Sequence, residues 1–132
     1  MAYTDDNFTK TLRQVLNDIE RLRRELTGYI INGEAHRVIA DIAVRIEELS
    51  LSIPTYNDVL SGLSRRLKLL STLAQALHNQ WKHVHSRRAL GRVNYLDQHL
   101  SEVEGILRDI EEKIKSGSID KTEIKVIRRI VF

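Results

Sequence analysis

The sequence predicts an all-α fold, a four-helix antiparallel bundle of long amphipathic helices. Apolar residues recur at alternating steps of three and four along most of the chain, which places them on one stripe of each helix. The chain has one Pro and six Gly, so few positions force a helix to stop. Its 132 residues are enough for a core without disulfides. We therefore expect a single domain over residues 1–132.

The first helix is predicted over residues 5–31. Its apolar stripe advances by three or four residues at every step, and Asn32-Gly33 supplies a stop signal. The second helix is predicted over residues 34–52. It ends before Pro54, because proline disfavours a helical conformation at the residue that precedes it. The two stripes are Phe8, Leu12, Val15, Ile19, Leu22, Leu26, Tyr29 and Ala35, Ile39, Ile42, Ile46, Leu49, Ile53.

The third and fourth helices are predicted over residues 55–85 and 87–116. Their stripes are Tyr56, Leu60, Leu63, Leu67, Leu70, Ala74, Leu77, Trp81, Val84 and Ala89, Val93, Leu96, Leu100, Val103, Leu107, Ile110, Ile114. A step of five separates Val84 from Ala89, with no Gly or Pro at the junction. One interpretation is a tight turn around His85-Ser86. The other is a continuous helix of roughly 60 residues with a phase slip. We favour the turn, because helices of globular domains are usually much shorter. Ser116-Gly117 should end the fourth helix.

The tail, residues 120–132, is rich in β-branched residues and fits either a short helix or a β-strand. A strand would need a partner that the rest of this chain does not offer, and would then pair with another molecule. Together with the heptad spacing of the helices, this apolar tail suggests self-association or membership of a larger complex.

The charge of the chain is unevenly distributed, although the net charge is only +3. Between Asp58 and Asp97 lie 38 residues without Asp or Glu, which hold seven of the 21 basic residues. The rest of the chain has 14 basic against 18 acidic residues, a balance of −4. A basic stretch of this kind is typical of a surface that binds a polyanion.

We expect this surface to bind nucleic acid through phosphates, without reading bases. The densest part is predicted to supply Lys82, His85, Arg87, Arg88 and Arg92, with Arg65, Arg66 and Lys68 as secondary contacts. Trp81 could stack on a base, but its position on the apolar stripe favours core packing. The resulting prediction is a coat or nucleoprotein subunit, or a small subunit of a ribonucleoprotein complex.

An alternative interpretation is that the basic third helix packs between two acidic helices. The chain would then be a protein–protein interaction or adaptor bundle without nucleic acid. Arg21, Arg23 and Arg24 alternate with Glu20 and Glu25 in the first helix, so we expect them to form surface ion pairs that contribute little to stability.

Catalytic and metal-binding patterns are scarce. The chain has no Cys, which excludes disulfides and thiolate metal sites. No two of the five His residues stand three or four apart, and no Glu-x-x-His pair exists, so the ligand spacing expected of a helical metal site is absent. Glycine-rich phosphate loops and nucleophile elbows are also missing. We expect a non-enzymatic protein with no cofactor and no metal.

Arg92 and His99 form an Arg-x6-His pair on one face of the predicted fourth helix. This pair resembles the Arg-x4-6-His motif of the HEPN family of helical ribonucleases. The resemblance covers these two residues and the all-helical character, and Val93 stands where that family often has a polar residue. It implies a ribonuclease in which Arg92 and His99 act on RNA across a dimer.

The N-terminal residues 1–7 have neither the basic nor the apolar region of a signal peptide. No apolar run approaches the length of a membrane span. The sequence therefore predicts a cytoplasmic protein that does not associate with membranes.

Overall fold

The computed structural model describes residues 3–28, 34–81 and 87–117, and the side chains of residues 7–28, 34–79 and 91–117. These residues form four α-helices and one short 3-10 helix, with no strand among them, so the predicted all-α class is confirmed for this part of the chain. The predicted tail, 120–132, lies outside the described residues. The elements are α1 (Tyr3–Thr27), α2 (Ala35–Ser52), η1 (Pro54–Tyr56), α3 (Asn57–Trp81) and α4 (Arg87–Lys115).

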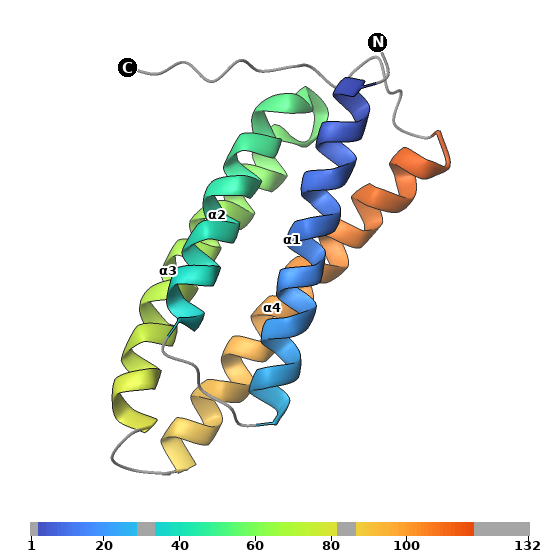
Figure 1. Ribbon diagram of the computed structural model, residues 1–132. Coiled ribbons are helices and arrows are strands. Elements are labelled where there is room, and N and C mark those ends of the chain that lie inside the picture. Colours follow the sequence, from blue (N-terminus) through green and yellow to red (C-terminus); the bar gives the residue numbers. More distant parts are fainter. Residues whose placement is uncertain (1–2, 29–33, 82–86, 118–132) are drawn as a thin grey trace, which may run out of the picture.

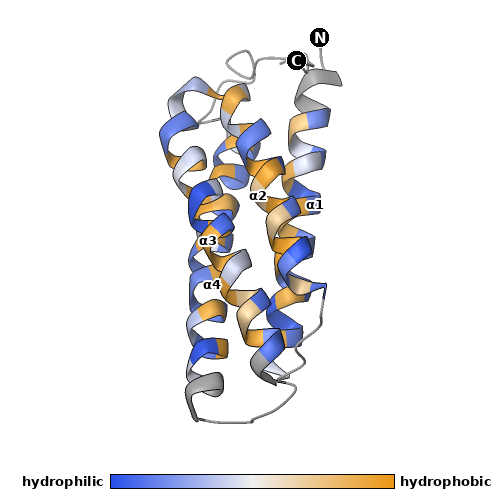
Figure 2. Ribbon diagram, turned by 90° about the vertical axis from the view of Figure 1, so that its left-hand side faces the viewer, coloured by the Kyte–Doolittle hydropathy of each residue, from blue (hydrophilic) through white to orange (hydrophobic). Residues whose placement is uncertain are grey.

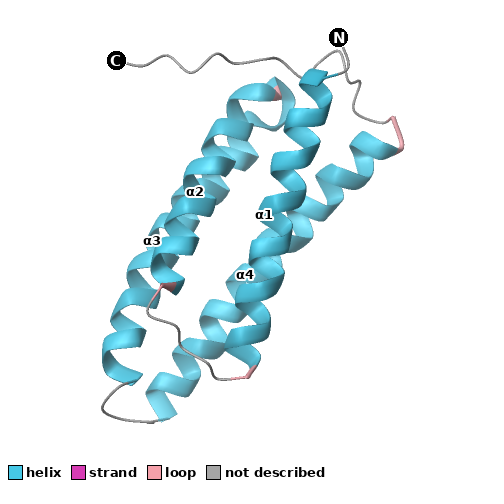
Figure 3. Cartoon of the chain, in the orientation of Figure 1, coloured by secondary structure: helices cyan, strands magenta, loops and turns pink. Residues whose placement is uncertain are grey.

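The four α-helices lie side by side, and successive helices point in opposite directions (Figure 1). Helix α2 packs most extensively against α3, and α1 packs against α4. The cartoon coloured by secondary structure shows the same two helix pairs (Figure 3). The ion pairs between α1 and α4 agree with this arrangement, since Arg13 contacts Glu111 whereas Arg23, further along α1, contacts Glu104.

Helices α3 and α4 are separate elements. Nε of Arg66 on α3 lies 2.8 Å from Nδ1 of His99 on α4, although the two residues are 33 apart in sequence. In a continuous helix they would be about 50 Å apart. This contact excludes the continuous helix as an interpretation of the phase slip, while the connection itself, residues 82–86, lies outside the described residues.

The ends of α2 and α4 follow the local signals in the sequence. Ile53 is extended (φ −125°, ψ 101°) as expected before a proline, and Pro54 begins η1. The side-chain amide of Asn57 donates to the carbonyl of Ser50 at 2.9 Å and so ties the start of α3 to the end of α2. At the end of α4, Gly117 takes φ +79°, a conformation that glycine adopts without steric cost.

One apolar core joins the four helices, and it consists mainly of Leu, Ile and Val side chains. The described members of the predicted stripes are buried in it, except Ala35 and Tyr56, which are partly buried. Apolar positions alternate with polar ones along every helix (Figure 2). The side chains of Tyr29, Trp81, Val84 and Ala89, which the stripes also include, lie outside the described residues.

Helices α2 and α3 approach through small residues. The buried hydroxyl of Ser64 donates to the carbonyl of Ala43 at 2.7 Å, and the hydroxyl of Ser71 donates to the carbonyl of His36 at 2.7 Å. A hydrogen bond from a short serine side chain to the backbone of another helix requires the two backbones to lie close together. This close approach explains why α2 and α3 pack more extensively than the other described helix pairs.

Candidate nucleic-acid interface

The densest part of the predicted basic surface falls largely outside the described residues. Lys82 and His85 belong to the connection between α3 and α4. Arg87 and Arg88 form the first two positions of α4, but their side chains are not described. The structure describes the side chains of the secondary part of the surface on α3, together with that of Arg92 on α4.

The three predicted cations of α3 have different surroundings. Arg65 is exposed and makes no ion pair with any described residue. Nζ of Lys68 lies 3.2 Å from Oε2 of Glu47 on α2. Arg66 pairs with Glu102 on α4. Two of the three cations are therefore paired with acidic residues of the neighbouring helices, as the adaptor interpretation predicted for a basic helix between acidic ones.

Arg92 belongs to a stripe of polar and aromatic residues on α4. It is followed at steps of three, four and three by Tyr95, His99 and Glu102, so all four lie on one face of the helix. Arg92 and His99, the pair that resembles the HEPN motif, are both partly buried. Tyr95 lies between them and is 51% exposed.

Residues from α3 and α4 meet in a group that we call the Tyr95 cluster: Arg66, Tyr95, His99 and Glu102. The Tyr95 and His99 rings have centroids 4.2 Å apart and planes tilted by 57°. Nε of Arg66 donates to Nδ1 of His99 at 2.8 Å, which places the ring proton of neutral His99 on Nε2. The hydrogen bond from Arg66 lowers the pKa of Glu102, and the charge of Arg66 lowers it further.

Sequence reasoning missed Tyr95, because it looked for apolar residues on the core stripe and for charged residues between Asp58 and Asp97. Tyr95 was neither. The signal was nevertheless present, since Tyr95 stands three residues after Arg92 and four before His99. It could have been found by asking which residues share a helix face with Arg92.

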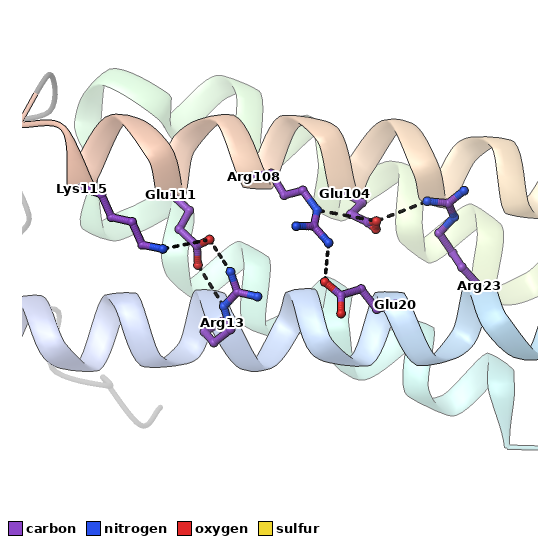
Figure 4. Close-up of polar contacts among 7 residues, drawn as sticks. All are labelled: Arg13, Glu20, Arg23, Glu104, Arg108, Glu111 and Lys115. Carbon is purple, nitrogen blue, oxygen red and sulfur yellow. Dashed lines mark hydrogen bonds and ion pairs between the residues drawn. The ribbon is translucent and has the colours of Figure 1, made fainter.

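A second group of charges lies between α1 and α4 (Figure 4). Arg13 pairs with Glu111, Glu20 with Arg108, and Arg23 with Glu104. Glu104 and Glu111 are almost fully buried, with exposed fractions of 8% and 7%. Arg23 forms ion pairs, as predicted, but its partners are on α4, where Glu104 and Asp97 accept its hydrogen bonds, and its side chain is partly buried.

A shallow polar depression of about 320 Å³ opens beside these charges and is lined by Glu20, Arg23, Arg24, Thr27 and Glu104. Oε2 of Glu104 has no hydrogen-bond partner there. Positive and negative side chains are balanced in this lining, so the depression has no preference for an anion and does not extend the basic surface.

The described part of the chain holds no group of three or more metal-ligating side chains. Within the same residues, every helix is too short or too polar to cross a lipid bilayer. Comparison with protein families, with curated proteins and with solved structures gives no match.

Proposed function

We propose that this chain is a non-enzymatic, nucleic-acid-associated assembly protein, an antiparallel bundle that binds phosphates through α3 and the start of α4. One observation carries the proposal. The interval without acidic residues, 59–96, covers most of α3 and the first part of α4, and these two helices pack against each other, as the contact between Arg66 and His99 illustrates. The predicted cations therefore belong mainly to two helices that are neighbours in the fold.

The proposed binding surface consists of cations that contact phosphates and carry no base readout. Arg65 supports it directly, since its guanidinium is exposed and no described acid neutralises it. Arg87 and Arg88 begin α4, where the unpaired backbone amides of a helix N-terminus also favour anions. Lys82, His85 and Arg92 complete the set. Such binding is tolerant of sequence and weakens with salt.

The biological roles that fit are a coat or nucleoprotein subunit, or a small subunit of a ribonucleoprotein complex. Both require self-association or a larger assembly, and both place the protein inside the cell, in the cytoplasm. The apolar tail, residues 120–132, is the segment of the sequence best suited to contact a neighbouring subunit.

The test is a salt titration of binding to a labelled oligonucleotide by fluorescence anisotropy. Wild type is compared with Arg87→Glu/Arg88→Glu and with a matched control, Arg21→Glu/Arg37→Glu, which changes the net charge equally on α1 and α2. We expect wild-type affinity to fall steeply with salt, the first variant to lose binding while staying helical, and the control to bind nearly as wild type. Absence of wild-type binding at low salt would refute the proposal.

A protein-interaction bundle is the second candidate, and two observations favour it. Arg66 and Lys68 are paired with Glu102 and Glu47, and the side chain of Leu69 on α3 is 74% exposed. This candidate predicts that the oligonucleotide does not bind and that Leu69 contacts a protein partner. A ribonuclease resembling the HEPN family remains the third candidate. It predicts that labelled RNA is cut by wild type and left intact by Arg92→Ala and His99→Ala.

A further inference from the structure

The Tyr95 ring is exposed to solvent and is also held in place by a neighbouring side chain. A single exposed aromatic residue is common on protein surfaces and needs no explanation by itself. Tyr95, however, is about half exposed while the ring of His99 lies against it with a centroid distance of 4.2 Å. An exposed ring that is held in place has lost part of the rotamer freedom that binding would otherwise cost.

The support of Tyr95 extends to the neighbouring helix. The His99 ring is fixed by the hydrogen bond from Nε of Arg66 on α3. Arg66 is fixed in turn by its pairing with Glu102, one turn beyond His99 on α4. Glu102, Arg66 and His99 thus form a chain of contacts that ends at the Tyr95 ring and holds its position from both helices.

The charges around Tyr95 favour an anion. Arg92 lies one turn before Tyr95 on the same face of α4, and Arg66 of α3 contacts the His99 ring that lies against Tyr95. Two acidic residues lie near Tyr95 along α4, Asp97 and Glu102. Asp97 is engaged by Arg23 of α1, and Glu102 by Arg66 of α3. Neither carboxylate is left to repel a phosphate, so the surroundings of the ring are cationic.

From these observations we propose that Tyr95 is a stacking platform for an unpaired base, and that the nucleic acid bound by this protein is single-stranded. The inference rests on the proposed function and adds the class of ligand to it. Aromatic side chains accept bases that are not stacked within a duplex, and every base has a face that can stack. Arg92, one turn before Tyr95 on the same helix face, would contact a phosphate next to that base.

The test compares a labelled single-stranded oligothymidylate with a labelled duplex of the same length, both at low salt. Wild type is measured beside Tyr95→Leu, Tyr95→Phe and the control Val44→Ala, which removes an exposed apolar side chain from α2. We expect Tyr95→Leu to weaken single-strand binding by about 5- to 150-fold, the range found for one stacked base. Tyr95→Phe keeps the ring and should retain most of the affinity.

The two proposals fail in different ways. If the duplex binds as tightly as the single strand, and Tyr95→Leu binds both as wild type does, the platform is refuted while phosphate binding stands. If wild type binds neither oligonucleotide, both proposals are refuted. Circular dichroism of each variant excludes unfolding as the cause, and Tyr95 is exposed enough for both substitutions to leave the helices intact.

The role of His99 as a positioning residue has a separate readout. His99→Ala should weaken single-strand binding less than Tyr95→Leu does. In the Tyr95→Leu background the same substitution should have little further effect, because the ring that it positions is gone. Equal losses in both backgrounds would show that His99 acts independently of Tyr95 and would overturn this part of the inference.

Discussion

The Nε atom of Arg23 on α1 donates to Oδ1 of Asp97 on α4 at 3.0 Å. The same guanidinium reaches Oε1 of Glu104 at 3.2 Å with its Nη1 atom. The hydrogen bond to Asp97 is the main cause that raises the pKa of Arg23 above its usual value. One side chain of α1 thus contacts two residues of α4 that are seven positions apart, about two helical turns.

Arg23→Met should destabilise the fold. Glu104 is 8% exposed and its Oε2 atom already lacks a partner, so removal of Arg23 leaves this carboxylate with Arg108 alone. Removing the partner of a largely buried charge lowers stability strongly, but solvent reaches Arg23 and weakens this effect. We therefore expect the free energy of unfolding to fall by about 1–3 kcal/mol. Urea unfolding at neutral pH measures the change.

Arg21→Met is the matched control for this prediction. Arg21 is exposed and pairs with Asp18 on its own helix at 3.6 Å. Exposed pairs of this kind contribute little, so the change in unfolding free energy should stay below about 0.5 kcal/mol. If Arg23→Met and Arg21→Met have the same free energy of unfolding, the contacts of Arg23 with α4 stabilise the fold no more than an exposed ion pair does. Glu104→Gln should recover part of the loss caused by Arg23→Met, because the buried charge is then removed.

The backbone approach of α2 and α3 gives the second prediction. Ser64→Ala leaves the Ala43 carbonyl without its side-chain donor and should cost about 1 kcal/mol of unfolding free energy. Ser64→Leu adds a large side chain at a buried position between close helices and should cost more, about 1–3 kcal/mol from overpacking alone. Thermal or urea unfolding of both variants provides the comparison.

Thr72→Ala is the control for Ser64. The Thr72 hydroxyl also donates to a backbone carbonyl, that of Lys68 at 3.4 Å, but within one helix and at the surface. Its removal should change stability by no more than about 0.5 kcal/mol. The interpretation of close helix packing is wrong if Ser64→Leu is tolerated as well as Thr72→Ala.

The lowered pKa of Glu102 predicts that the stability of the fold depends on pH. Its pKa in the folded protein lies below the ordinary value of 4.5, mainly because Arg66 donates a hydrogen bond to it. The stabilisation is fully present above pH 4.5 and is lost as the pH falls through the lower, folded value. Wild type should therefore be more stable than Glu102→Gln at neutral pH, and this small difference should vanish in acid.

The control for the pH prediction is Arg66→Gln, which removes the donor responsible for the lowered pKa. In this background, Glu102→Gln should produce no pH-dependent difference in the urea midpoint. A difference that persists without Arg66 would assign the effect to another group.

The helical core could be predicted from the sequence because each helix repeats the same apolar spacing. Leu60, Leu67 and Leu100 lie on such stripes and are buried as the spacing requires. Pro54 and Gly117 marked helix ends by restricting or permitting particular backbone angles. These are local effects, and the residues that cause them are visible within a few positions of the chain.

The polar contacts could not be predicted in the same way, because they depend on which helices become neighbours. The sequence placed Arg23 among acids of its own helix, yet its partners lie on α4, 74 and 81 residues away. The Tyr95 cluster likewise requires Arg66 and His99 to meet across two helices. A sequence pattern shows which face of a helix a residue occupies, but not the charge of the helix opposite it.

Ion pairing within the fold predicts which cations of α3 contribute to nucleic-acid binding. Lys68 is held by Glu47 of α2, whereas Arg65 has no described acidic partner. A cation that must break an ion pair with a carboxylate before it contacts a phosphate contributes less to the binding free energy than an unpaired cation does. Arg65→Ala should therefore lower the slope of log affinity against log salt by about 0.7 for a single strand, and Lys68→Ala by clearly less.

Glu47→Gln provides the complementary measurement. This substitution frees Lys68 and removes a negative charge from the neighbouring helix, so oligonucleotide affinity should rise and the salt slope should steepen. In the Glu47→Gln background, Lys68→Ala should then cost as much as Arg65→Ala does in wild type. If Lys68→Ala already matches Arg65→Ala in wild type, internal ion pairing does not decide which cations reach the phosphates, and the basic surface acts through its total charge.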